Sequence, residues 1–327
     1  MRKIILLIAI MIQIVVGGCS QATQKSSDTN IKFPEKPIEL IVPSGPGSAV
    51  DTIARVVAQQ AEKYLPNGQS VAVINKPGGA TTIGLSEVYN AKPDGHTIGI
   101  TANQISIQPH YGKTIFTHDS FATILRLQSE ASVLIVKADS PWNTFDEWVE
   151  YAKQNPGKFK HGTTGVGGGP DIVMKAIEQS KGIQTKAVSF NSGGEVINAL
   201  LGGHIQGAMV LPQLAKPKVD DGQVKVLVAT GRERYEPFQD VPLLSEKGVD
   251  IGFDIATGFI APKNTPKEII NILHDAFKNA LDDPEVIEQM KKMGSAPKYG
   301  STDEYQKNIT DSFNAYGDVM KKMGMIK

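Results

Sequence analysis

The chain has 327 residues, which is enough to bury a large core and to form two domains. Its 34 lysine and arginine residues balance 34 aspartate and glutamate residues, and removal of residues 1–18 would leave 32 against 34, a formal charge of −2. This balance, an aromatic content of 6% and the absence of any lysine- or arginine-rich run argue against a nucleic-acid partner.

The N-terminal segment has the pattern of a secretory signal. Arg2 and Lys3 precede the apolar run Ile4–Val16, which at 13 residues is short for a membrane-spanning helix of about 20. We therefore expect residues 1–18 to be a signal peptide that directs the rest of the chain out of the cytoplasm.

The apolar run ends in the sequence VGGCS, and Cys19 is the only cysteine of the chain. This sequence resembles the lipobox of bacterial lipoproteins, which implies cleavage before Cys19 and attachment of diacylglycerol to its thiol. A buried structural cysteine is the alternative interpretation. A single cysteine excludes an intrachain disulfide, and the polar, aperiodic residues 19–32 are expected to form a flexible tether between the lipid and the folded body.

The first strand, loop and helix form one predicted unit. Ile38–Val42 is predicted to be a strand, and a turn of Gly45, Pro46 and Gly47 leads into a helix capped by Ser48. The free N–H groups at the start of this helix would suit a carboxylate or a phosphate above the loop. The alternative is a turn that needs glycine only for its geometry.

Strands and helices continue to alternate after this unit. A strand over Val71–Ile74, a helix that ends at Ala91 and a strand over His96–Ala102 are predicted. This alternation predicts an α/β fold, with a mostly parallel sheet covered by helices on both faces and ligands at the carboxyl ends of the strands.

A second series of strands and helices comes next. Strands are predicted over Phe159–Thr164, Gln206–Leu211 and Val224–Thr230. The loop Gly165–Asp171 has the same spacing of Gly-x-Gly and aspartate as Gly45–Asp51. The two halves of the chain therefore each offer a glycine loop before a helix.

The C-terminal part is predicted to be mainly helical. Helices over Pro266–Leu281, Pro284–Met293 and Thr302–Lys322 follow a predicted strand at Gly258–Ala261. We expect these helices to pack on the first domain.

The sequence contains no pattern of a catalytic or metal centre. The six histidines are dispersed, and the motifs H-E-x-x-H, G-x-S-x-G and G-x-x-x-x-G-K-[ST] are absent. Val50 takes the place of the third glycine of a G-x-G-x-x-G dinucleotide motif. We therefore predict no catalytic residue, no metal and no cofactor.

Neither glycine loop contains a positively charged residue. Binding of an anion would then depend on backbone N–H groups, on water and on the hydroxyls of Ser44, Ser48 and Thr164, which is enough for a small carboxylate between two closing lobes. Asp51 and Asp171 are most simply dipole partners and local caps in this interpretation. Contact with the ligand is the alternative.

Several motifs in order resemble the Bug family, the substrate-binding proteins of tripartite tricarboxylate transporters. They are FPEKPI from Phe33, IVPSGPGSAVDTIAR from Ile41, NKPGGA from Asn75, KPDGHT from Lys92, the Gly165 loop, ALLGG from Ala199 and APKNTP from Ala261. The resemblance covers the chain from about residue 33 to the C-terminus. It implies a two-lobed periplasmic-binding-protein fold of type II, in which each lobe is a doubly wound, mostly parallel sheet.

The resemblance also implies how the chain is divided and what it binds. Residues 33–130 together with 256–327 would form lobe 1, which carries the C-terminal helices, and residues 131–255 would form lobe 2. Such a receptor, expected to be a monomer, would close on a small organic carboxylate and deliver it to a membrane carrier made of a large and a small subunit.

Carried over to this sequence, the resemblance assigns the ligand contacts to the two glycine loops. A carboxylate would be held by backbone groups and ordered waters, with contacts from Ser44, Gly45, Pro46, Gly47, Ser48, Asp51, Thr164, Gly165, Val166, Gly167 and Gly168. Asn103 and Met209 are predicted to belong to the specificity pocket. The sequence departs from the family's pattern at Ser44, Ser48, Gly168 and Asp171, and an Asp171 that faced the cleft would favour a ligand with an amino group, such as an amino acid.

The predicted function is therefore that of a lipid-anchored receptor outside the cytoplasm, on the periplasmic side or the outer face of the membrane. It would capture a mono-, di- or tricarboxylate for a tripartite tricarboxylate-type transporter and would not be an enzyme. Two alternatives are a ligand sensor of the same fold that signals to a membrane kinase and an extracytoplasmic enzyme that acts on a small acid.

Overall fold

The structure, a computed structural model, describes residues 32–164, 167–231, 234, 238–249, 251 and 254–326. The predicted signal peptide, Cys19 and the tether up to residue 31 lie outside the described residues. Contacts within the chain define one compact unit over Phe33–Lys327.

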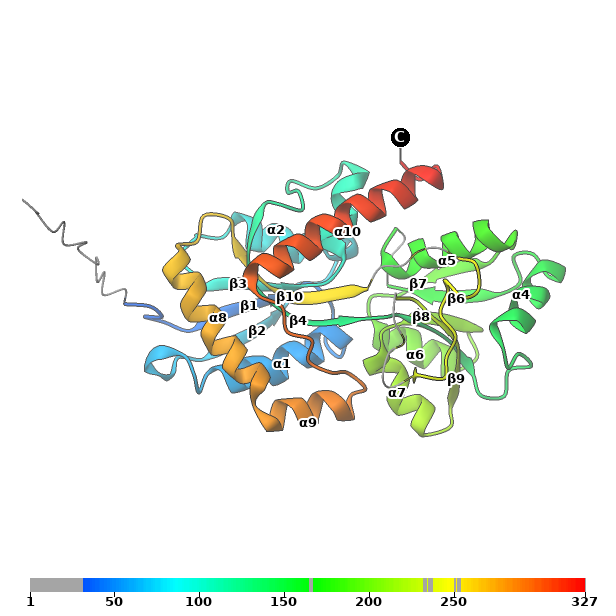
Figure 1. Ribbon diagram of the computed structural model, residues 1–327, viewed down its shortest axis with the longest axis horizontal. Helices are drawn as coiled ribbons and strands as arrows, with labels where there is room; N and C mark the ends of the chain where they lie inside the picture. The colour runs from blue at the N-terminus through cyan, green and yellow to red at the C-terminus, as the bar shows by residue number, and fades with distance from the viewer. Residues whose placement is uncertain are drawn as a thin grey trace, which may run out of the picture. The chain divides into compact units, whose positions relative to one another are not determined.

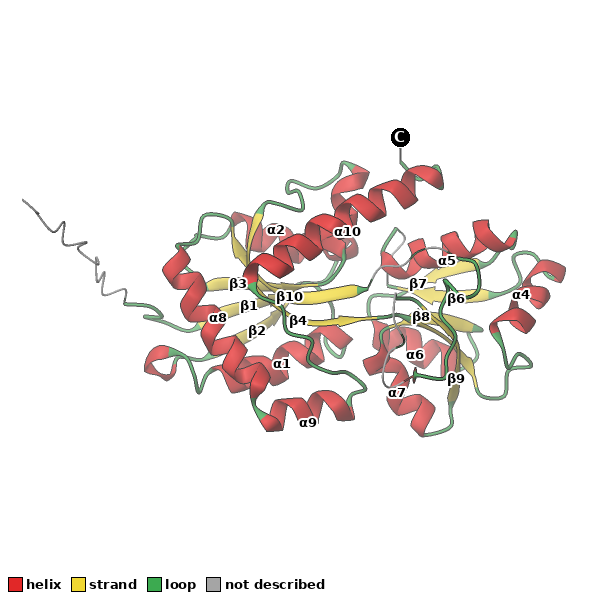
Figure 2. Cartoon of the chain, in the orientation of Figure 1, coloured by secondary structure: helices red, strands yellow, loops and turns green. Residues whose placement is uncertain are grey.

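The strands of this unit form two five-stranded sheets within the described residues (Figure 1; strands yellow in Figure 2). The first sheet has the order β2-β1-β3-β10-β4, with β1 parallel to β2 and β3, and with β10 antiparallel to both β3 and β4. Its strands are β1 (Ile38–Val42), β2 (Val71–Asn75), β3 (Thr97–Thr101), β4 (Phe121–Glu130) and β10 (Ile255–Pro262).

The second sheet has the order β7-β6-β8-β5-β9. β6 runs parallel to β7 and β8, whereas β5 runs antiparallel to β8 and β9. Its strands are β5 (Val133–Lys137), β6 (Lys160–Thr163), β7 (Lys186–Ser189), β8 (Gly207–Val210) and β9 (Val224–Ala229). We call each sheet with its covering helices a lobe, the first and the second.

Each sheet therefore contains one reversed strand at the same place, next to the edge strand. The reversed strand is the one that comes after a passage of the chain between the sheets: β5 follows β4, and β10 follows β9. Two segments of chain thus connect the lobes, residues 131–132 between β4 and β5 and residues 230–254 between β9 and β10.

The described helices are α1 (Ala49–Ala61), α2 (Thr82–Asn90), α3 (Gln104–Ile107), α4 (Phe145–Gln154), α5 (Gly169–Lys181), α6 (Gly193–Leu201), α7 (Pro212–Asp220), α8 (Lys267–Asp282), α9 (Pro284–Lys292) and α10 (Thr302–Lys322). Local chemistry explains where several of them begin. The hydroxyls of Ser48, Thr144, Ser192 and Ser301 each accept the N–H of the residue three positions later, which satisfies one of the donors that a helix start leaves unpaired.

Helices cover both faces of each sheet. In the first lobe α1 and α8 pack against each other and on the sheet, while α2, α3 and α10 contribute to a core on the other side that includes Ile41, Leu85, Ile260 and Tyr305. In the second lobe the strand β5 directs Val133 and Ile135 to one core and Leu134 and Val136 to another, as the alternation of a strand requires.

The last helix, α10, packs on both lobes. Tyr305 and Ile309 in its first half belong to the core of the first lobe. Tyr316 and Met320 in its second half belong to a core that includes Ile172 on α5 of the second lobe. The expected C-terminal helices are present, but the end of α10 reaches beyond the first lobe.

The structure confirms the α/β architecture with two mostly parallel sheets. The strands predicted over Ile38–Val42 and Val224–Thr230 correspond to β1 and β9, and the helix predicted over Thr302–Lys322 is α10. The strands β4 and β5 and the helix α7 were not predicted from the sequence. Arg126, Gln128 and Glu130 alternate with the other side chains of β4, so the two-residue period of a strand was present in the sequence.

Candidate functional site

A cavity of about 310 Å³ lies where the carboxyl ends of strands from both sheets meet. Most of its lining comes from the ends of β1, β2, β3, β6, β7 and β8 and from the segments that lead from these strands into helices. The described residues that line it are Pro43, Ser44, Ser48, Ala49, Val50, Pro77, Gly78, Gly79, Ala80, Thr81, Thr101, Ala102, Asn103, Gln104, Ser132, Thr163, Thr164, Gly168, Gly169, Pro170, Ser189, Phe190, Asn191, Ser192, Gly193, Val196, Met209, Val210, Leu211, Leu214 and Ile255.

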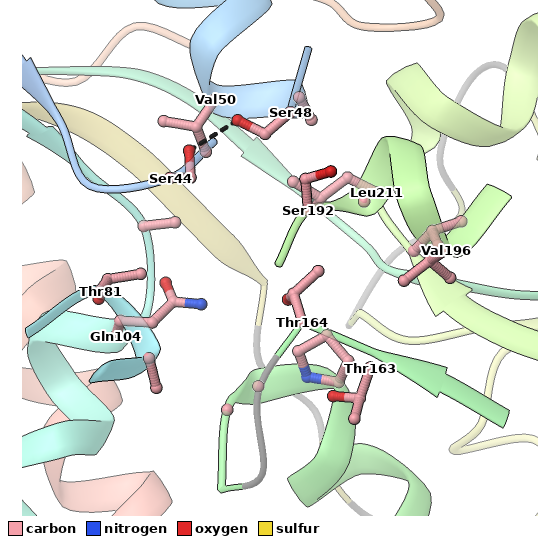
Figure 3. A pocket seen from close by; sticks show the side chains of 18 of the residues that line it. Ser44, Ser48, Val50, Thr81, Gln104, Thr163, Thr164, Ser192, Val196 and Leu211 are labelled. Atoms are coloured by element: carbon pink, nitrogen blue, oxygen red, sulfur yellow. Dashed lines mark hydrogen bonds between the residues drawn. The ribbon is translucent and has the colours of Figure 1, made fainter. Parts of the chain in front are cut away.

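In the first lobe, two serine hydroxyls and the start of α1 face the cavity. Figure 3 shows Ser44 and Ser48 joined by a hydrogen bond of 2.6 Å between their hydroxyl oxygens. The first hydrogen bond inside α1 runs from the Thr52 N–H to the Ser48 carbonyl at 2.9 Å. The N–H groups of Ala49 and Val50 precede that bond, and with the helix dipole they form an electropositive end suited to an anion.

In the second lobe, two helix starts face the same cavity. Gly168 is the N-cap of α5 and has no side chain for capping, and Pro170 in the first turn removes one N–H donor. Ser192 caps α6, accepting the Glu195 N–H at 3.2 Å, and lines the cavity opposite Ser48 (Figure 3). The second lobe therefore also offers helix starts to the cavity, but α5 offers fewer polar groups than α1.

The loop before α2 lines the first-lobe side in an unusual conformation. Gly78, Gly79, Ala80 and Thr81 are consecutive residues with positive φ, and the values for Ala80 and Thr81 are 50° and 78°. A left-handed conformation is costly for residues with a Cβ, and such strain is concentrated at functional sites. Thr81 is part of the cavity lining, and its buried hydroxyl makes no hydrogen bond within the described residues.

Asp51 lies behind the first glycine loop rather than in the cavity wall. Its carboxylate accepts the Gly47 N–H at 2.9 Å and the Asn75 amide at 2.8 Å, and it pairs with Arg55 at 3.0 Å. Burial alone would raise the pKa of Asp51, but the hydrogen bonds from Arg55, Asn75 and Gly47 hold the pKa below its ordinary value. The carboxylate thus fixes the shape of the loop that presents Ser48.

Asp171 has the matching arrangement in the second lobe. Its carboxylate accepts the Gly167 N–H at 2.7 Å and pairs with Lys175 at 3.4 Å. Asp171 is 1% exposed and, like Asp51, is not among the described residues that line the cavity. Both aspartates therefore hold a glycine loop in place through the same two contacts.

The lobes touch beside the cavity in this conformation. The Tyr111 hydroxyl, from the first lobe, donates to the Gly167 carbonyl of the second at 3.3 Å. Burial and the negative charge of Asp171 raise the pKa of Tyr111 to about 12, so the hydroxyl keeps its proton at physiological pH. On another side, a Cβ added at Gly45 would lie 3.6 Å from the Ser192 Cβ.

The electrostatic character of the cavity is set by its lining. None of the described lining residues has a charged side chain. The second lobe adds a group of apolar side chains to the wall, and Figure 3 shows Val196 and Leu211 on the side away from Ser44. Its members are Phe190, Val196, Met209, Val210, Leu211 and Leu214. The cavity combines uncharged hydrogen-bond donors with an apolar wall, as is common in sites for small molecules.

The structure places the predicted site residues in three groups. Ser44, Ser48, Asn103, Thr164, Gly168 and Met209 line the cavity. Gly45, Pro46, Gly47, Gly167 and Asp51 belong to the two glycine loops but are not among the described lining residues. Gly165 and Val166 lie outside the described residues.

Several parts of the cavity lining were not predicted from the sequence. The segments Gly78–Thr81 and Phe190–Gly193, and the side chains of Leu211 and Leu214, were not among the predicted site residues. The glycines at positions 78 and 79, directly before a helix, were the available signal for the first segment. Within the described residues there is no group of three or more histidine, cysteine, aspartate or glutamate residues placed to bind a metal ion.

Comparison with known proteins places the chain in a family. A model of the receptor of the tripartite tricarboxylate transporter family matches residues 53–325. The UPF0065 protein in the gbd 5′ region of Cupriavidus necator is 32% identical over 313 residues, which cover 95% of this chain and 94% of the relative.

Solved structures agree with this match. The periplasmic binding protein BugD is 26% identical with a TM-score of 0.84, and the match covers 90% of this chain and 100% of that chain. MatC from Rhodopseudomonas palustris, solved with bound malate, is 23% identical with a TM-score of 0.80 and covers 88% of this chain and 99% of its own. At this identity, the similarity to MatC shows a shared fold and no more.

Proposed function

Because the chain belongs to the receptor family of the tripartite tricarboxylate transporters, we propose that it captures a small organic carboxylate outside the cytoplasm and delivers it to a membrane transporter of that type. The family is one of solute receptors and not of enzymes. The Bug-family prediction is thereby confirmed, whereas the ligand, the anchor and the partner belong to the proposal.

The observation that carries the proposal is the convergence of uncharged donors on one cavity between the lobes. The starts of α1, α5 and α6 and the hydroxyls of Ser44 and Ser48 all face it. A carboxylate in this position would exchange its hydration for N–H and O–H donors without needing a lysine or arginine. MatC with bound malate gives one example of a carboxylate in this fold.

Closure of the lobes is the proposed means of signalling occupancy. A ligand that contacts both walls binds the closed arrangement better than an open one and shifts the population towards closure. We propose residues 33–130 with 256–327 and residues 131–255 as the moving lobes, with the large and small membrane subunits of the transporter as the partners that recognise the closed form.

A thermal-shift screen tests the ligand class. The mature protein is mixed with hexanoate, benzoate, adipate, L-malate, citrate or L-glutamate, and a ligand at 100 times its Kd should add about 2.7 kcal/mol to the free energy of unfolding. We expect at least one acid to shift Tm and to bind with one-to-one stoichiometry in calorimetry. The absence of any shift from all six acids at a concentration of about 10 mM, which would occupy about nine-tenths of a site with a Kd of about 1 mM, would contradict the proposal.

Two cellular experiments separate the remaining parts of the proposal. Uptake of the labelled acid in a deletion strain distinguishes transport, which should be lost, from sensing, in which uptake through the carrier persists. Membrane fractionation of a Cys19→Ser variant tests the anchor, because the wild type should remain with the membrane and the variant should be released. No helix in the described part of the chain is long and apolar enough to cross a membrane.

A further inference from the structure

The helix α10 carries two buried tyrosines that contact the same loop in different ways. The Tyr305 hydroxyl donates to the carbonyl of Thr101, the last residue of β3, at 3.1 Å. The Tyr316 hydroxyl accepts a hydrogen bond from the side-chain amide of Asn103. Tyr305 therefore holds a backbone group that the sheet already fixes, whereas Tyr316 holds a side chain that could otherwise rotate.

Asn103 lines the cavity, and its side chain does not cap the helix that follows it. It occupies the N-cap position of α3, where asparagine commonly accepts a backbone N–H of the helix. Its φ and ψ of −67° and −12° are helical, and its side chain makes no capping hydrogen bond. Asn103 is 4% exposed and lines the cavity, so its amide is held by Tyr316 next to the space for the ligand.

Tyr316 also depends on the position of the second lobe. Its ring belongs to the same core as Ile172 on α5. A Cβ added at Gly169, the first residue of α5 and itself part of the cavity lining, would lie 3.9 Å from the Tyr316 hydroxyl oxygen. The Tyr316 side chain thus bonds to a cavity residue of the first lobe and shares a core with α5 of the second.

We propose that Tyr316 is a positioning residue that turns the Asn103 amide towards the bound carboxylate when α5 packs against the end of α10. The hydrogen bond with Tyr316 uses one N–H of the amide, and the second N–H remains to be donated within the cavity. This inference rests on the proposed function, because it assigns the ligand that this second N–H serves. Through the hydrogen bond between Tyr316 and Asn103, the packing between the lobes would affect the affinity for the ligand.

The test compares Tyr316→Phe with Tyr305→Phe. Each variant removes one buried tyrosine hydroxyl from the same helix and keeps the ring, since the two residues are 1% and 0% exposed. Both should lower Tm by a similar amount, because each leaves a buried polar partner unsatisfied. Calorimetric titration with adipate and with hexanoate should show about tenfold weaker binding for Tyr316→Phe, which corresponds to about 1.4 kcal/mol, and less than a twofold change for Tyr305→Phe.

A second measurement needs no ligand. Hydrogen–deuterium exchange of the free proteins should rise in residues 103–111 and 169–174 for Tyr316→Phe but not for Tyr305→Phe. Equal exchange in the two variants, or equal affinities where the wild type binds a probe, would overturn the inference. A wild type that binds neither acid would contradict the ligand class tested, and the exchange data alone would then decide whether Tyr316 couples the two segments.

Discussion

Gly47 and Gly167 have the same φ of +77°, and each donates its N–H to an aspartate four residues later, yet their loops present different surfaces. The first loop is flanked by Ser44 and Ser48, whose hydroxyls bond to each other at the cavity. The second has Thr164 at the position that corresponds to Ser44, but it leads into α5 through Gly168 and Pro170, which offer no hydroxyl and one N–H fewer.

This difference indicates that the two lobes contribute different interactions to ligand binding. The same loop conformation, held by Asp51 in one lobe and Asp171 in the other, places a helix start at the cavity in each lobe. Both lobes line the cavity with polar side chains, which in the second lobe are Thr163, Thr164, Ser189, Asn191 and Ser192. The second lobe adds an apolar wall suited to the carbon skeleton of a ligand, whereas Ser44 and Ser48 of the first lobe suit its charged end. Changing the ligand, or single residues of either loop, tests this difference between the two lobes.

The largest expected effect comes from adding charge to the ligand. Affinity should fall in the order hexanoate, adipate, citrate, by about 100-fold in total or about 2.7 kcal/mol, because additional carboxylates would lie against uncharged and partly apolar surfaces. Calorimetry at constant ionic strength measures the series. Equal or tighter binding of citrate would mean that the second lobe also holds charge.

The next effect comes from the glycines of the two loops. An alanine Cβ at position 167 would lie 2.6 Å from the Tyr111 hydroxyl, whereas at position 47 it would meet none of the described residues beyond its chain neighbours within 4 Å. Both substitutions carry the cost of a left-handed alanine, about 1 to 2 kcal/mol. Gly167→Ala should also displace Tyr111 and weaken binding of the preferred acid by about 30-fold or 2 kcal/mol.

Gly47→Ala is the matched control for that experiment, and it should change affinity less than threefold while Tm falls by a similar amount. Titration of both variants with the same acid measures the contrast. Equal losses of affinity would show that the contact between Tyr111 and Gly167 does not contribute to binding.

A smaller effect is expected from the two serine caps at the cavity. Ser48 and Ser192 accept N–H groups at 3.1 and 3.2 Å, so replacing either with alanine should lower the free energy of unfolding by about 1 kcal/mol. Only Ser48 also bonds to Ser44 in the group proposed to hold the carboxylate. Ser48→Ala should weaken binding about tenfold and Ser192→Ala less than threefold in the same titration. If Ser48→Ala loses stability and affinity equally, the residue is a helix cap and no more.

The smallest effect on affinity is expected from Asp51. Its folded-state pKa is depressed below the ordinary value of 3.8, so its contribution to stability is present above that pH and is lost as the pH falls through the folded-state pKa. Asp51→Asn should therefore lower the free energy of unfolding by about 1 to 3 kcal/mol at pH 7, with a smaller difference at pH 3. Chemical denaturation across this pH range measures it, and a difference independent of pH would refute the assigned cause.

The sequence was sufficient for the parts of the fold and site that depend on local patterns. The apolar run Ile38–Val42 next to a glycine turn predicts β1, and the spacing of Gly45–Asp51 and Gly165–Asp171 identified the paired loops. It was insufficient where residues distant in the chain meet. The contact between Asn103 and Tyr316 joins positions 213 residues apart, and neither residue carries a local signal of its partner.

The same limit explains why the apolar wall of the cavity was not predicted from the sequence. Leu211 is the N-cap of α7 and Leu214 lies in its first turn, and this helix is interrupted by Pro217. Proline inside a helix removes the pattern by which a helix is recognised. The role of the two leucines becomes visible only when the carboxyl end of β8 is placed beside the cavity.

The packing of α10 on both lobes has a consequence for how affinity can vary. If only the closed arrangement binds, the measured Kd equals the intrinsic Kd divided by the fraction of free protein that is closed. The contacts of Met320 and Tyr316 with the second-lobe core contribute to that fraction. Substitutions on the last turns of α10 could therefore tune affinity and residence time over a wide range while every group that touches the ligand stays the same.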